Sequence, residues 1–244
     1  MMASSRYVRF EVLRTWRSRR YLVFSLGFPL VLFLVVAGPN RHAHLDGISF
    51  PLYYMTGMTA WGAMVAVVSS GGRIAAERSV GWTRQLRITP LKTSTYFSAK
   101  VLSGYLVALL SIAVLFLAGS AVGVRLSAAE WSTTVGLLLV GLVPFAVLGI
   151  LLGHLVKVDS LGPALGGSTS LFALLGGAYG PLVSSGVFFS LVKCLPSYWL
   201  VQAGKSALGT GGWPPAEAWI VIAAWTVVLS WLARLAYVRD TARV

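Results

Sequence analysis

The stretch Ala75–Lys100 reads AAERSVGWTRQLRITPLKTSTYFSAK and separates two long apolar runs. It is the longest hydrophilic segment between such runs, and six of the chain's twenty basic residues lie in it or at its edge. Thr89 can cap a helix and Pro90 suits the first helical position, while Thr93 or Ser94 offers a second start. The pattern predicts a short helical pair at a membrane face that meets another protein. A solvated loop that only sets topology is the alternative.

The apolar runs on both sides of this loop place the chain in a membrane. The chain is 57% hydrophobic and 11% charged, whereas soluble domains carry about 25% charged residues. A spanning helix needs about 20 apolar residues, and six runs fit. We therefore predict an all-α integral membrane protein, a single transmembrane domain over residues 1–244. Its approximate spans are 21–39, 50–72, 101–123, 133–154, 161–183 and 217–235.

The basic residues predict the orientation of these spans. With the N-terminus in the cytoplasm, sixteen of the twenty basic residues fall in cytoplasmic segments and four in outer loops. Positive charge is retained on the cytoplasmic side, so both termini are expected there. The net charge of +13 then indicates topology and attraction to anionic membrane lipids. Nucleic-acid binding is disfavoured, because the basic residues flank spans and form no continuous patch.

The segment 4–20 predicts an amphipathic helix in the membrane interface. Tyr7, Phe10, Leu13 and Trp16 recur at every third position, and arginines occupy the remaining angles. Such a helix lies with its apolar face down and its guanidinium groups toward the lipid phosphates. Contact with a partner protein is one interpretation, and a plain basic topology signal is the other.

A second unusual stretch lies at residues 186–212. Its apolar part is too short to span and is interrupted by Lys193, Cys194 and Pro196. We predict outer re-entrant helices, which need protein or water beside them at membrane depth. A peripheral loop is the alternative.

In the first span, Gly27 and Pro29 predict a kink.

The residues needed for catalysis are missing. No GxxxxGK[ST] phosphate-binding loop occurs, and no Ser/His/Asp or Cys/His set lies on facing positions. The seven carboxylates all lie in loops, in flanks or at helix ends. The single cysteine excludes an intramolecular disulfide, and His42 and His44 beside Asp46 are a weak metal candidate. We expect no enzyme in its own right, no metal and no directly bound cofactor. Energy for any transport must then enter from outside the membrane, through the central loop.

The region 53–100 resembles the membrane subunits of ABC type-2 transporters, the bacterial export permeases. The resemblance begins with the aromatic-x-x-Gly pattern that ends at Gly57. It continues with Glu77-Arg78-Ser79-Val80-Gly81-Trp82-Thr83-Arg84-Gln85-Leu86-Arg87-Ile88-Thr89-Pro90-Leu91, followed by Lys100. Trp82 stands where the family more often has a small residue. The order of spans is similar over nearly the whole chain, but only the central loop is specific.

The resemblance implies an exporter permease in the bacterial cytoplasmic membrane. Two such subunits, identical or paralogous, would form a dimer and dock on separate cytosolic ATP-binding subunits that carry ATP and Mg. The loop 75–100 would hold the coupling helix, and the cargo would be a drug, an antibiotic or a lipid-like molecule. The residues expected at the ATPase-coupling interface are Glu77, Arg78, Gly81, Trp82, Thr83, Arg84, Gln85, Leu86 and Pro90.

Glu77 is expected to orient the loop through a charged partner, namely Arg78, Arg84 or an ATPase residue. A solvated carboxylate is the alternative for this residue. For the whole chain, the alternative function is a membrane scaffold or sensor without transport, which recruits a cytosolic partner through the same loop.

Overall fold

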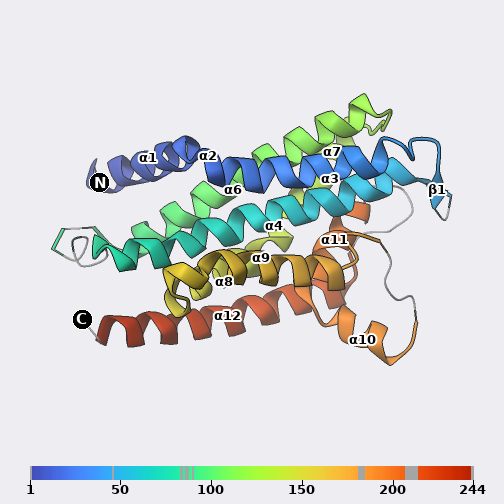
Figure 1. Ribbon diagram of the computed structural model, residues 1–244. Helices are drawn as coiled ribbons and strands as arrows, with labels where there is room; N and C mark the ends of the chain where they lie inside the picture. The colour runs from blue at the N-terminus through green and yellow to red at the C-terminus, as the bar shows by residue number, and fades with distance from the viewer. Residues whose placement is uncertain are drawn as a thin grey trace.

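The computed structural model describes residues 2–45, 47–82, 85, 88–89, 91–180, 185–206 and 214–242. The described chain is almost entirely helical, as an all-α membrane protein requires. Its helices run side by side in one bundle (Figure 1). Both chain termini lie at the same end of this bundle, which we call the N/C end. The strand β1 (His44–Leu45) and the helices α10 (Val187–Lys193) and α11 (Pro196–Ser206) lie at the opposite end.

The first part of the chain forms one interrupted helical rod. It comprises α1 (Met2–Arg17), α2 (Arg19–Leu22), a π-helical turn η1 (Val23–Gly27) and α3 (Phe28–Ala37). The π-turn lies beside Pro29, where the kink was predicted. Pro29 has no N–H to offer the Ser25 carbonyl, and Ser111 Oγ of α6 lies 3.5 Å from that oxygen. A neighbouring helix therefore supplies a donor to the freed carbonyl.

The remaining elements follow a short hairpin. The strands β1 (His44–Leu45) and β2 (Ile48–Ser49) pair antiparallel. The helices after them are α4 (Phe50–Ser79), α6 (Thr93–Ala121), α7 (Ala128–Gly141), α8 (Val143–Leu155), α9 (Val158–Leu175), α10 (Val187–Lys193), α11 (Pro196–Ser206) and α12 (Ala216–Ala242).

Helix α4 is the centre of the bundle. It packs on α3, α6, α8, α9 and α11, and most of its residues are buried. Its crossing with α8 uses glycines: a Cβ on Gly71 would lie 2.5 Å from the Gly149 carbonyl carbon, and one on Gly153 would lie 2.6 Å from the Gly71 oxygen. Small residues allow helix backbones to approach closely. The spacing of Gly149 and Gly153 thus serves α4–α8 packing.

Three helical stretches among the described residues are long and apolar enough to cross a membrane: Thr93–Ala121, Ala128–Leu155 and Ala216–Asp240. The second combines α7 and α8, which join at Leu142. Val23–Ala37 is a shorter apolar stretch. The outer surface of α12 exposes large apolar side chains such as Val227 and Trp231, which is what contact with lipid tails requires.

The segment 186–212 contains α10 and α11, and residues 207–213 lie outside the described part. Helix α11 contacts α4, α7, α9 and α12, and its Trp199, Leu200 and Val201 are buried. The Trp199 indole N–H donates to the Lys193 carbonyl at 2.7 Å. Helix α11 is therefore packed into the bundle end, which argues against a loosely attached peripheral loop.

Candidate functional site

The candidate site begins where α4 ends, at the N/C end of the bundle. Helix α4 stops at Ser79, and Gly81 follows with φ +71°. This left-handed conformation is strained for residues with a Cβ, so Gly81 suits the exit from the helix. Glu77 and Arg78 occupy the last turn of α4. Successive helical residues are about 100° apart, so these two neighbours point toward different helices.

Glu77 points into a buried cluster that joins three helices. Its carboxylate accepts hydrogen bonds from Arg14 Nη1 at 2.5 Å and from the Tyr96 hydroxyl at 2.6 Å. It also pairs with Lys100 Nζ, which reaches the Glu11 carboxylate at 2.6 Å on its other side. We call these five residues the Glu77 cluster. It connects α4 to α1 and to the beginning of α6.

The charges of the Glu77 cluster are almost completely removed from solvent. The side chains of Lys100, Glu11 and Glu77 are at most 1% exposed, whereas that of Arg14 is 42% exposed. Buried charges are tolerated only when they are paired and hydrogen-bonded. Burial by itself would raise the pKa of Glu77, but the charge and hydrogen bond of Lys100 outweigh it, and the net pKa lies below its ordinary value.

The buried side chains of α1 that face the Glu77 cluster repeat at the regular spacing of one helix face. Glu11 and Thr15 are buried and Tyr7 is half-buried, at a spacing of four residues that aligns side chains on one face. Tyr7 packs against Tyr96 with ring centroids 6.2 Å apart. Arg73 of α4 extends the contact, because its Nη1 donates to Thr15 Oγ1 at 2.9 Å. Tyr7 therefore faces protein, while Phe10, Leu13 and Trp16 remain about half-exposed.

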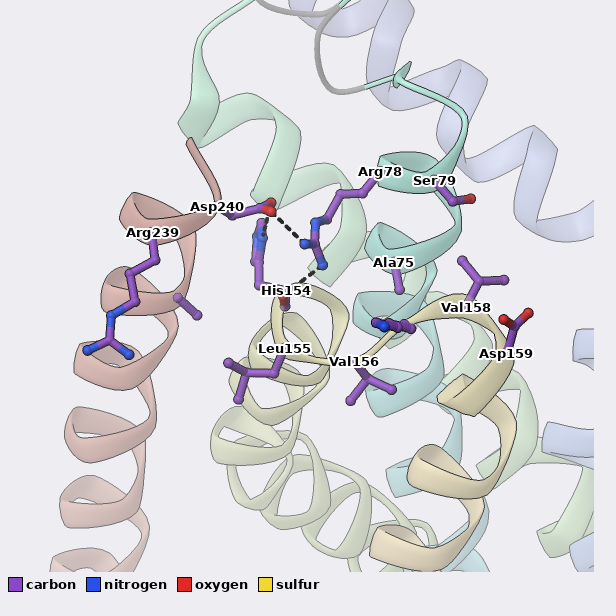
Figure 2. A pocket seen from close by; sticks show the side chains of 12 residues that line it. Ala75, Arg78, Ser79, His154, Leu155, Val156, Val158, Asp159, Arg239 and Asp240 are labelled. Atoms are coloured by element: carbon purple, nitrogen blue, oxygen red, sulfur yellow. Dashed lines mark hydrogen bonds and ion pairs between the residues drawn. The ribbon is translucent and has the colours of Figure 1, made fainter. Parts of the chain in front are cut away.

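Arg78 points to the other side of α4, toward α8 and α12. Its guanidinium donates to the carbonyls of Gly153 and His154 at 3.1 and 2.7 Å, and to the Asp240 carboxylate at 2.5 Å. His154 Nδ1 lies 3.3 Å from the second Asp240 oxygen. Figure 2 shows this Arg78 cluster of Arg78, His154 and Asp240. The two carbonyls belong to the C-terminal turn of α8, where a cation is favoured by the helix dipole.

A cavity of about 750 Å³ opens beside the Arg78 cluster. Its walls come from the ends of α4, α8 and α12 and from the beginning of α9 (Figure 2). Lys157, Asp159 and Arg239 add charges to its lining. The cavity lies at the N/C end, immediately next to the loop that leaves α4.

The structure describes only part of the predicted coupling loop. Gly81, Trp82 and Gln85 are described, while Thr83, Arg84, Leu86 and Pro90 lie outside the described residues. The Gln85 N–H donates to the Gly81 carbonyl at 3.3 Å, which forms a helical turn directly after α4. Gln85 is exposed, and Trp82 is half-buried.

One local prediction about this loop needs correction. Pro90 lies outside the described residues, but Leu91 and Lys92 are not helical, so the helix expected after Thr89 does not continue through them. Lys92 is instead the residue before α6, which begins at Thr93, the second predicted start. The helical turn of the loop lies nearer to α4, close to the exposed Gln85.

Among the predicted charged partners of Glu77, Arg84 lies outside the described residues, and Arg78 is the one that the structure describes. Arg78 binds Asp240 and not Glu77, and the observed partners are Arg14 and Lys100, whose positions are 63 and 23 residues away. Glu77 is not a solvated carboxylate. Glu11 is the only acidic residue before Asp46, and its partners were not predicted. A single acidic residue among the arginines of α1 was the sequence feature that could have indicated a buried ion pair.

The described residues contain no group of three or more His, Cys, Asp or Glu side chains that could hold a metal ion. Asp46, which completes the weak candidate at His42 and His44, lies outside the described residues. Both clusters are networks of ion pairs and hydrogen bonds that join helix ends, and two members of the Arg78 cluster, His154 and Asp240, also line the cavity. Their chemistry suits mechanical connection between helices.

Comparison with known proteins assigns the architecture to a family. The family described as "ABC-2 family transporter protein" matches residues 37–235, which is most of the chain. The chain belongs to the ABC-2 transporter family. A relative from Bacillus subtilis (strain 168), "Putative transport permease YvfS", is 31% identical over 209 residues, which cover 83% of this chain and 81% of the relative.

The resemblance inferred from the central loop is therefore confirmed, and the ABC-2 chain is a membrane transport permease. The matched region begins within α3 and ends within α12, so it includes Glu77 and Arg78 but not α1. Glu11 and Arg14 consequently join the site from outside the matched part of the family.

Proposed function

We propose that this permease is the membrane subunit of an ATP-driven exporter whose ATPase is a separate cytosolic chain. The loop after α4 is the proposed coupling element. The observation that carries the proposal is the anchoring of the loop's first helix on two sides. Adjacent residues Glu77 and Arg78 tie α4 to α1 and α6 through one cluster, and to α8 and α12 through the other.

This arrangement supplies a mechanical route from the loop to the spans. Ion pairs and hydrogen bonds between buried or half-buried groups resist separation more than surface contacts do. A force on the loop at Gly81–Gln85 reaches α4 directly, since α4 ends only two residues earlier. From α4 it passes to four neighbouring helices through two side chains. Glu77 and Arg78 therefore act as positioning residues behind the contact surface, and Gln85 is an exposed residue available for that surface.

The proposal includes six spans with both termini in the cytoplasm. The N/C end then faces the cytoplasm, where the ATPase binds, and α10 and α11 form the outer re-entrant helices. The only cysteine provides a direct test, because Cys194 is exposed and directly follows α10, which lies at the opposite end of the bundle. A membrane-impermeant maleimide should label it in intact cells.

The topology test has a matched control in the loop. A Cys194→Ser, Gln85→Cys variant should react with the same reagent only after the membrane is opened. Labelling of position 85 in intact cells, or protection of Cys194 until lysis, would reverse the proposed orientation.

The transport machine is proposed to contain two permease copies or paralogues, two ATP-binding subunits that hold ATP and Mg, and a drug, antibiotic or lipid-like cargo. Co-purification of the tagged chain from native membranes, followed by an ATPase assay, tests the core of this proposal. Arg84→Glu should remove the ATP-binding subunit, while Arg125→Glu, a matched charge reversal at an exposed position in the predicted outer loop, should keep it. Recovery of the chain without any ATPase would favour the scaffold or sensor function instead.

Glu77→Gln separates coupling from assembly. This variant should retain the ATP-binding subunit, because Glu77 is buried and does not present its side chain at the surface. It should lower ATP-dependent uptake of a fluorescent amphipathic dye into inverted vesicles, which corresponds to export from the cell, relative to ATP hydrolysis. Unchanged export per ATP hydrolysed would contradict the role of the Glu77 cluster in coupling.

A further inference from the structure

Helix α1 carries a groove that none of the preceding functions explains. The groove has a volume of about 300 Å³ and is lined by Phe10, Leu13, Arg14, Arg17 and Ser18. Leu13, Arg14 and Arg17 follow Phe10 by three, four and seven positions, so these four residues lie on one side of α1. Ser18 occupies the one-residue break between α1 and α2, so the groove lies where the helical rod is interrupted.

The lining combines two chemistries in a small space. Phe10 and Leu13 are about half-exposed and apolar, whereas Arg14 and Arg17 are exposed cations. A ligand that satisfies both must carry an anionic group next to a hydrocarbon portion. A free phosphate ion satisfies only the arginines, and an uncharged hydrocarbon satisfies only the other two side chains.

We propose that this groove binds one anionic phospholipid, with the headgroup phosphate between Arg14 and Arg17 and the first part of an acyl chain against Phe10 and Leu13. Guanidinium groups match phosphate geometry and form paired hydrogen bonds with it. Anionic lipids are concentrated in the cytoplasmic leaflet. The site requires only that α1 lies at a membrane surface, and it does not depend on ATPase binding.

Arg14 connects this lipid site to the interior of the protein. A guanidinium has five N–H donors, and the contact of Arg14 with the Glu77 carboxylate is made by one nitrogen, Nη1. The Arg14 side chain as a whole is 42% exposed, so it is accessible from outside the protein. A bound headgroup therefore holds Arg14 from outside while Glu77 holds it from inside. The bound lipid then contacts Arg14, the same residue that joins α1 to Glu77 of α4.

The test measures lipid association with the full chain in phosphatidylcholine bilayers that contain a trace of spin-labelled phosphatidylglycerol. At about 1 M salt the Debye length falls to about 3 Å, so diffuse attraction is suppressed and direct contacts remain. Arg17→Gln should weaken phosphatidylglycerol association about fivefold, because it removes a direct, charge-assisted contact with the phosphate. Arg17→Lys should give an intermediate loss, because it keeps the charge but not the paired hydrogen bonds of the guanidinium.

The matched control is Arg9→Gln, which removes an exposed arginine of α1 that does not line the groove. It should change association by less than about twofold under the same screened conditions. Equal losses for Arg9→Gln and Arg17→Gln would show that the helix attracts anionic lipid without a site, and would overturn the proposal.

A second variant separates a lipid from a free headgroup. Phe10→Ala combined with Leu13→Ala should also lower phosphatidylglycerol association, because the acyl contact is lost. Soluble glycerol phosphate should not displace the lipid. If the double variant binds normally and glycerol phosphate competes, the groove recognises phosphate alone and the proposal of a lipid is wrong. Unfolding midpoints equal to wild type confirm that each variant remains folded.

Discussion

Lys100 offers the sharpest perturbation of this permease, because it is the buried cation between two buried carboxylates. Its side chain is 0% exposed and contacts Glu11 at 2.6 Å and Glu77 on the other side. Lys100→Met keeps an unbranched side chain of similar length but removes the charge. Glu11 and Glu77 then remain buried without the cation that pairs them, although Arg14 still reaches Glu77.

The expected magnitude follows from that geometry. Removing one partner of a buried ion pair costs about 3–5 kcal/mol of unfolding free energy, and Lys100 makes two such contacts. The loss should be measured from unfolding in mixed detergent micelles. Lys157→Met is the control, since Lys157 is exposed in the turn before α9 and its loss should lie within about 0.5 kcal/mol.

A neutralised cluster provides the decisive comparison. Lys100→Met combined with Glu11→Gln and Glu77→Gln removes the charges together, and the stability should recover toward wild type because no uncompensated carboxylate remains. The reasoning is refuted if Lys100→Met costs no more than Lys157→Met. It is also refuted if the triple variant is less stable than Lys100→Met alone.

Three further predictions concern packing, the Arg78 cluster and pH. Gly71→Ala should destabilise the folded protein by about 1–3 kcal/mol, because the new Cβ would lie 2.5 Å from the α8 backbone. Gly166→Ala is the control and should not destabilise it, because nothing lies within 4 Å of the Cβ position there. Thermal unfolding of both variants checks this prediction. Arg78→Gln should cost about 1.5–3 kcal/mol in detergent unfolding, since it loses contacts to two carbonyls and Asp240. Arg239→Gln at an exposed position of the same cavity should stay within about 0.5 kcal/mol, and equal losses would contradict the anchoring role of Arg78. The pKa of Glu77 is lower in the folded protein than its ordinary value of 4.5. The ionised carboxylate therefore stabilises the fold fully at pH values above 4.5, and this contribution is lost as the pH falls through the lower pKa of the folded state. Glu77→Gln should therefore flatten the loss of stability below pH 4.5, and an unchanged acid profile would contradict the assignment.

The sequence predicted the membrane class and the central loop for physical reasons that are local. Long uncharged runs are stable only in the apolar interior of a membrane, and a polar, basic stretch between two of them must leave the membrane. The start of α6 at Thr93 and an irregular helical turn next to Pro29 were also readable, because each depends on the backbone chemistry of one or two residues.

The partners of the charged residues were not readable from the sequence. Glu77 lies 63 positions from Arg14, and Arg78 lies 162 positions from Asp240. No periodicity links residues at such separations, and both ends of each pair have an ordinary local explanation as flanking charges. The adjacent letters Glu77-Arg78 even suggested a pair with each other, whereas the angle between successive helical residues directs them to opposite sides.

The sequence by itself determined that this chain enters a membrane as helices and that one basic loop stands apart, since hydropathy and turn chemistry act within a few residues. Only the tertiary structure decided that α4 is the buried axis, that α1 joins it through the Glu77 cluster, and that Arg78 secures α8 and α12. These outcomes depend on which helix ends pack together. A buried charge must find its partner across the bundle, and the packed bundle alone determines which partner it meets.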